Sequence, residues 1–77
     1  MNRGAEMSLA KAERGRKCTI VSMKTERALE ERLAALGLFP GAEVEVVRNS
    51  RNGEMILACF DSRFALGREL ASAIEVI

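Results

Sequence analysis

Leucines recur at helical spacing near the middle of the chain. Leu29, Leu33 and Leu36 stand at i, i+4 and i+7, so they share one face of a helix. Thr25 is expected to cap this helix, with Glu26 as its first residue at the positive end of the helix dipole. The pattern therefore predicts one amphipathic helix.

The end of this helix is marked by three residues that each act on the backbone. Gly37 stands where a left-handed C-terminal cap is needed, and Leu38 is expected to pack back on Leu33. Pro40 prevents the helix from continuing. The helix is therefore expected to end at a sharp corner before Gly41.

Apolar and polar residues alternate with period two after this corner. Val44 and Val46 are expected to point inward, and Glu43 and Glu45 to point into water. This alternation predicts a half-buried strand.

Shorter patterns predict the remaining elements. In a strand over residues 16–23, Cys18 and Ile20 are expected to point inward. The pair Asn52-Gly53 readily adopts positive φ and predicts a hairpin into a strand over residues 54–60. The chain then ends with an extended segment at 64–66, a helical connector at 67–73 and a last strand at 74–77.

The strand over residues 54–60 is apolar on both faces. Ile56 and Phe60 are expected to point inward, with Ala58 between them. The opposite face carries Met55, Leu57 and Cys59, which are either covered by the helix or exposed as a binding stripe. We expect a protein-interaction site made of this stripe together with a residue at the corner before Gly41; its residues are Phe39, Met55, Leu57 and Cys59.

Short strands with one inserted helix in 77 residues fit a single small domain. We expect a mainly β protein with an SH3-like barrel that closes on itself and hides its strand edges. Residues 1–7 are expected to be a flexible N-terminal tail, and residues 8–77 the domain, with Ser8 as a helix cap. The expected core is Ile20, Leu29, Leu33, Leu36, Val44, Val46, Ile56, Phe60, Leu66, Ile74 and Val76.

Composition narrows the possible functions. Twelve Lys and Arg against eleven Asp and Glu give a net charge of +1, which disfavours nucleic acid as a partner. The chain has no His, Trp or Tyr, so most general-base chemistry is excluded and an enzyme is not expected. Its apolar segments are too short to insert into a membrane.

Two cysteines are the only candidate ligands for a soft metal. Cys18 and Cys59 could supply thiolates, but two ligands do not complete a tetrahedral site. Isolated cysteines in strands are usually small core residues, so we expect no cofactor and no bound metal. Their number also fits a reduced, cytoplasmic environment.

Three segments resemble the FeoA family of ferrous-iron transport accessory proteins. They are Leu-Ala-Ala-Leu-Gly-Leu-Phe-Pro-Gly-Ala-Glu-Val-Glu-Val at 33–46, Asn-Gly-Glu-Met-Ile at 52–56 and Ala-Leu-Gly-Arg-Glu-Leu-Ala at 65–71. Gly67 departs from the family pattern, where Arg is common. The resemblance implies a cytoplasmic SH3-like domain that binds FeoB, a ferrous-iron membrane transporter with a GTP-binding domain, and regulates it.

A second reading comes from another class of protein. The chain is also similar to the SH3-like C-terminal modules of iron- and manganese-dependent transcriptional repressors, which implies a metal-responsive regulatory module. Self-association through the stripe is a further possibility. Arg48 and Arg51 form a basic hairpin tip, which is expected to be a solvated turn unless Lys17 or Arg63 lies beside it.

Overall fold

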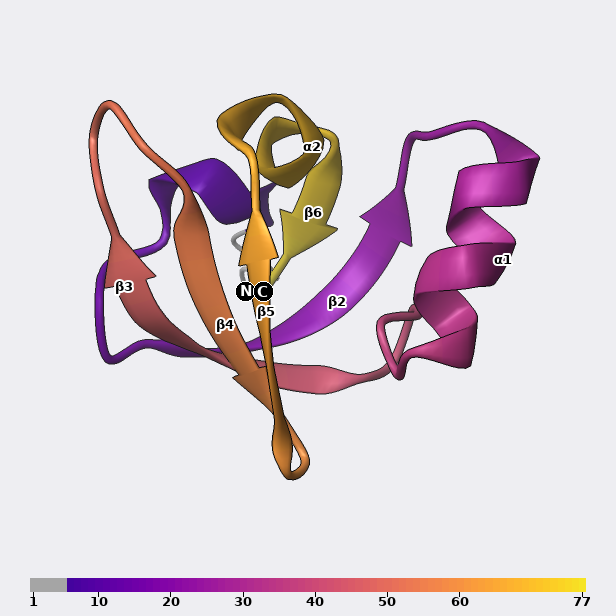
Figure 1. Cartoon of the computed structure of the whole chain (residues 1–77), viewed down its shortest axis with the longest axis horizontal. Coiled ribbons are helices and arrows are strands. Elements are labelled where there is room, and N and C mark those ends of the chain that lie inside the picture. Colours follow the sequence, from indigo (N-terminus) through magenta and orange to yellow (C-terminus); the bar gives the residue numbers. More distant parts are fainter. Residues whose placement is uncertain (1–5) are drawn as a thin grey trace.

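The structure, a computed structural model, describes residues 6–77, and over these residues six strands form one antiparallel sheet. The sheet order is β1-β6-β2-β3-β4-β5, and the sheet is strongly curled, with α1 set to one side (Figure 1). The elements are β1 (Met7–Ser8), η1 (Leu9–Lys11), β2 (Lys17–Met23), α1 (Arg27–Ala35), β3 (Glu43–Asn49), β4 (Met55–Cys59), β5 (Ser62–Leu66), α2 (Arg68–Ser72) and β6 (Ile74–Val76).

This architecture confirms the mainly β, SH3-like fold, but two details differ from expectation. Within residues 6–77, no ladder joins β1 to β5, so the two edges of the sheet are not paired with each other. Strand β1 has only two residues and is therefore too short to close the sheet. The expected tail is also too long, because Met7 already pairs with Val76 in the sheet; residues 1–5 of that tail lie outside the described part.

The core lies between the curled strands and confirms most of the expected positions. The confirmed residues are Ile20, Leu33, Val44, Val46, Leu66, Ile74 and Val76. Leu29 only packs against the edge of this core. Leu36 and Phe60 were expected inside but are exposed, and Ile56 is half-buried.

The two faces of β4 are reversed relative to the expectation. Met55, Leu57 and Cys59 are buried, so their assignment to an exposed stripe is wrong. The register explains this, because Leu57 pairs with Val46 of β3. Directly opposed residues in an antiparallel pair share a face, so an inward Val46 requires an inward Leu57.

Helix α1 begins one residue later than expected and ends as expected. Glu26 is its N-cap residue, and the Thr25 side chain donates to the Glu26 carbonyl instead of capping the helix. At the other end, the amide of Leu38 donates to Leu33 O at 2.9 Å and that of Gly37 donates to Ala34 O at 3.0 Å.

These two bonds form a Schellman motif, with Gly37 at φ 104°. The motif turns the backbone so that Leu38 enters the core, where it is fully buried. Leu36 is the C-cap residue that follows Ala35, and it stays on the outside, with 57% of its surface exposed.

A bulge in β3 changes which side chain faces inward near the hairpin. The register of β3 with β4 shifts between Val46 and Arg48, so that Asn49 pairs with Met55. A shift of one residue exchanges the two faces of a strand, and Asn49 therefore takes the inner side in place of Arg48. The connecting loop over residues 50–54 differs from the expected tight turn, because Gly53 does not have positive φ.

Candidate functional site

Three exposed apolar residues belong to two turns that meet at Gly37, where a Cβ would lie 3.6 Å from the Phe60 ring. Leu36, Phe39 and Phe60, which we call the apolar corner, expose 57%, 39% and 81% of their surface. Leu36 and Phe39 belong to the turn after α1, and Phe60 belongs to the turn between β4 and β5 (Figure 1). Two segments distant in the sequence therefore form one surface.

The conformation of Phe60 is unusual for a bulky residue. It lies in the two-residue turn that joins β4 to β5, with φ 57°. Non-glycine residues in this left-handed region cost roughly 1–2 kcal/mol, and a large aromatic gains nothing from adopting it. Phe60 thus combines backbone strain with an almost fully exposed ring.

The ring of Phe60 lies near Gly37. A Cβ at position 37 would stand 3.6 Å from two ring carbons, which is ordinary van der Waals contact. Beside them, the buried Cys59 thiol donates to Gly37 O at 3.5 Å, and burial raises the pKa of this thiol above its usual value. A neutral thiol is the form that donates this hydrogen bond.

The Phe39 side of the corner is fixed by backbone hydrogen bonds to β2. The Phe39 carbonyl accepts from the Ala42 amide at 2.9 Å, which closes a tight turn. The Gly41 amide donates to Ile20 O at 2.7 Å, and the Ile20 amide donates to Ala42 O at 2.9 Å. The backbone that carries Phe39 is therefore held to the sheet.

A shallow hollow with a charged rim adjoins the corner. It has a volume of about 230 Å³ and is lined by Lys17, Glu43, Val44, Glu45, Ala58 and Phe60. Apolar anchors beside a polar rim are the usual composition of a protein docking surface. The apolar corner is therefore suited to binding another protein.

The structure retains only part of the interaction site expected from the sequence. Phe39 lies on the surface as a candidate, whereas Met55, Leu57 and Cys59 lie inside. Phe60 and Leu36 were missed. The signal that could have found Phe60 was cross-strand register, since placing Val46 inward fixes Leu57 inward and leaves Phe60 outside the strand.

The cysteines are not gathered into a metal centre. Cys18 on β2 and Cys59 on β4 are free thiols, both buried. Between Glu6 and Ile77, no three side chains of His, Cys, Asp or Glu come together in a way that could hold an ion. Over the same residues, no helix has the length and apolar character needed to cross a membrane.

Comparison with known proteins identifies close counterparts of this chain. A family model described as "FeoA domain" matches residues 7–77. Among solved structures, an iron uptake regulatory protein (FeoA) is 28% identical over 94% of this chain and 96% of its own, with a TM-score of 0.85. A FeoA protein from Chlorobium tepidum is 30% identical over 91% of this chain and 68% of its own, with a TM-score of 0.82.

The fold is shared with a different class of protein as well. A manganese-dependent transcriptional repressor superposes on 99% of this chain with a TM-score of 0.84, at 18% identity. The match covers 43% of the repressor, and at this identity it shows the fold alone. A search of curated protein sequences found no match.

Proposed function

The chain belongs to the FeoA family, and from this premise we propose that it is a cytoplasmic accessory protein of ferrous-iron transport. In this role it binds a membrane transporter of the FeoB type and regulates its activity. The solved relatives support the link to iron, since their names are those of an iron uptake regulatory protein and an iron(II) transport protein. Such a role requires binding and no catalysis by this chain.

The observation that carries this proposal is the state of Phe60. A residue with φ 57° and 81% exposure costs stability in the free protein and contributes no core packing. Strain and exposed aromatic surface are typical of a residue kept for contact with a partner. Phe39 and Leu36, which are also exposed, would extend this contact along the turn after α1.

The test is co-purification of the chain with a FeoB-type transporter from detergent-solubilised membranes of the source cell. Phe60→Ser and Phe39→Ser should each reduce recovery of the transporter by about tenfold or more, as expected for aromatic anchors. Ile77→Ser is the matched control, because Ile77 is also exposed, at 47%, but follows β6 and belongs to neither turn of the apolar corner.

The circular dichroism melting temperature of each variant separates loss of contact from loss of fold. Both Phe variants should melt no lower than the Ile77→Ser control. Equal transporter recovery by all three variants would place the contact elsewhere, and no recovery by the unaltered chain would remove FeoB binding from the proposed function.

A further inference from the structure

Four cationic side chains from three separate elements surround a second cleft, far from the apolar corner. The cleft has a volume of about 370 Å³ and is lined by Ala10, Lys11, Ala12, Glu13, Arg14, Asn49, Arg51 and Arg68. The cations come from η1 and the segment after it, from the β3–β4 loop and from α2. Lys11, Arg14 and Arg68 are distant from Arg51 in the sequence, and the fold brings all four to one cleft.

The base of the cleft is built around the half-buried guanidinium of Arg68. Its Nη1 donates to Asn49 Oδ1 at 2.8 Å and to Ser50 O at 2.6 Å, and its Nη2 donates to Ala10 O at 2.8 Å. The Asn49 amide donates in turn to Ala10 O at 3.0 Å and Ala12 O at 2.8 Å. This network ties η1, the hairpin and α2 together.

The acceptors of Arg68 in this network are all neutral. They orient the guanidinium but do not compensate its charge, which is partly removed from water. With Lys11, Arg14 and Arg51 beside it and Glu13 as the acidic residue of the lining, the cleft carries a formal charge of +3.

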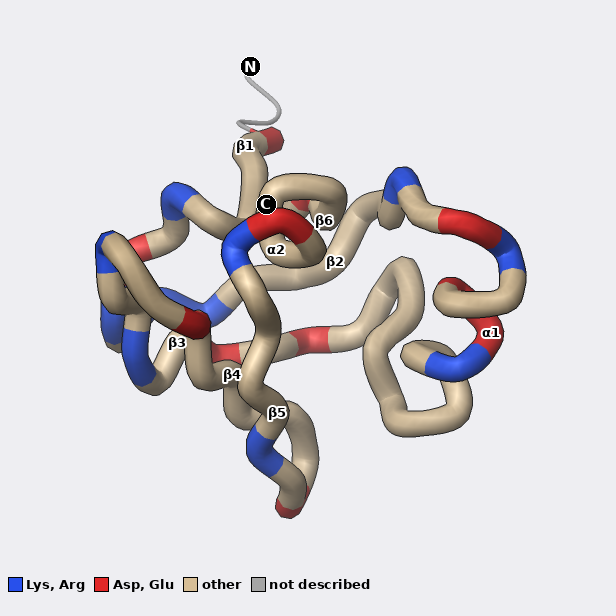
Figure 2. The backbone as a smooth tube through the Cα atoms, turned by 45° about the horizontal axis from the view of Figure 1, so that its top comes forward, with Lys and Arg blue, Asp and Glu red and all other residues tan. Residues whose placement is uncertain are grey.

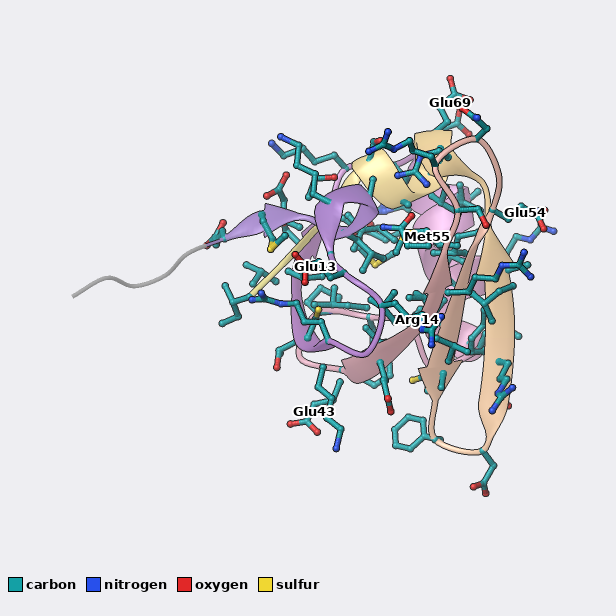
Figure 3. The ribbon with its side chains drawn as sticks, turned by 90° about the vertical axis from the view of Figure 1, so that its left-hand side faces the viewer. Glu13, Arg14, Glu43, Glu54, Met55 and Glu69 are labelled. Carbon is teal, nitrogen blue, oxygen red and sulfur yellow. The ribbon has the colours of Figure 1, made fainter. Side chains whose placement is uncertain are left out.

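The rest of the surface is charged differently. Figure 2 shows blue segments concentrated around the β3–β4 loop and the segment after η1, whereas positive and negative residues alternate along α1. Figure 3 views the molecule from the cleft side, with Glu13 and Arg14 on the segment that follows η1. Although the net charge of the chain is only +1, positive charge is concentrated at one end of the molecule.

We propose that this basic cleft binds a multiply charged phosphate anion. Arginine forks match phosphate oxygens in a bidentate geometry, and a +3 cleft is better neutralised by a phosphate or pyrophosphate group than by one carboxylate. The cleft is at the lower end of the volumes typical of small-ligand sites, which suits a pyrophosphate-sized group. The same chemistry is offered by a free phosphate compound and by a phospholipid whose headgroup is a phosphate monoester.

The test is a titration of ¹⁵N-labelled protein with pyrophosphate at low salt, followed by amide chemical shifts. Shifts should concentrate at residues 10–14, 49–51 and 67–69, and binding should weaken as salt is raised. The double variant Arg14→Gln with Arg51→Gln should lose about tenfold or more in affinity. Arg68 is left unaltered in this test because it also holds the fold together.

A charge-matched control distinguishes the cleft from general electrostatic attraction. Arg27→Gln with Arg32→Gln removes the same charge from exposed positions on α1 and should leave affinity within about twofold. Glu13→Gln should strengthen binding, because it removes the carboxylate that repels the anion.

Vesicles separate the two sources of phosphate. Binding to vesicles that contain phosphatidic acid, whose headgroup is a phosphate monoester, but not to phosphatidylcholine vesicles, with loss in the Arg14/Arg51 variant, would assign a lipid headgroup; binding to pyrophosphate alone would assign a soluble compound. The proposal is overturned if neither probe binds, if an acidic polypeptide binds where both fail, or if the α1 control loses as much affinity as the cleft variant.

Discussion

The ring of Phe60 lies against the backbone of Gly37, so that a turn between two strands meets the corner that ends the helix. A Cβ on Gly37 would stand 3.6 Å from the ring, and the neighbouring Cys59 Sγ would be 3.8 Å away. Position 37 therefore lies beside both an exposed residue, Phe60, and a buried one, Cys59. Cys59, which contributes to the core, and Phe60, which we propose contacts the partner, are therefore adjacent in the sequence.

Gly37→Ala should destabilise the domain by about 1–2 kcal/mol. The cause is the backbone, since φ 104° places an L side chain in a costly left-handed conformation while the space around it is sufficient. Urea unfolding measures the effect. Gly67→Ala is the control, because Gly67 has φ −66° and open space around it, and it should cost only a few tenths of a kcal/mol. Equal stability of the two variants would show that the corner tolerates a side chain.

Leu57→Ala should cost about 2–5 kcal/mol, a large part of the stability of so small a domain. Leu57 is fully buried and pairs with Val46, so its removal leaves a cavity in the core. Ile56→Ala on the opposite face of β4 should cost clearly less, because Ile56 is only half-buried. Thermal melts of the two variants compare the faces directly, and a larger loss for Ile56→Ala would contradict the observed register.

The sequence was most informative where local chemistry decides the structure. Gly37 and Pro40 predicted the corner because a left-handed cap and a helix stop are properties of single residues. Alternation predicted the inward positions Val44 and Val46 for the same reason. The structure confirms these predictions, which needed no information about neighbouring elements.

Features that depend on pairing between strands could not be predicted from local sequence. An apolar strand such as β4 has no alternation to separate its faces, and only its register with β3 places Leu57 inside and leaves Phe60 exposed. The bulge after Val46 likewise turns Asn49 inward, where it meets Arg68. Both candidate sites therefore depend on tertiary contacts, which local sequence patterns do not show. Of the expected interaction residues, only Phe39 is on the surface.

Arg68→Lys should destabilise the domain by about 1–3 kcal/mol although it keeps the charge. A lysine has one ammonium in place of a planar fork and cannot satisfy Asn49 Oδ1, Ser50 O and Ala10 O together. Arg63→Lys on the exposed side of β5 should change stability by less than about 0.5 kcal/mol. Denaturant midpoints of the pair measure the difference, and similar midpoints would mean that charge alone holds this network.

Alkaline pH should destabilise the folded chain through Cys59. Burial raises the pKa of this thiol in the folded state, so the stability it contributes is complete below its unfolded pKa of about 9 and is lost as pH rises through the folded value. The thiolate also cannot donate to Gly37 O. Between about pH 8 and about pH 10, unaltered protein should therefore lose more stability than Cys59→Ala does, as measured by unfolding at each pH. Parallel pH dependences would contradict a raised thiol pKa.

Replacing Phe60 should separate stability from partner binding. Asparagine tolerates the left-handed conformation that Phe60 adopts at φ 57°, so Phe60→Asn should raise the stability of the free domain by about 0.5–1 kcal/mol. Phe60→Val keeps an apolar side chain but is β-branched, and it should lower stability at the same position. If the strained conformation of Phe60 serves contact with the transporter, the Phe60→Asn variant will melt at a higher temperature than the unaltered chain and yet recover less transporter in co-purification. A variant that melts higher and binds as well as the unaltered chain would show that the exposed ring has no role in the contact, and Phe39 with Leu36 would then have to carry it alone.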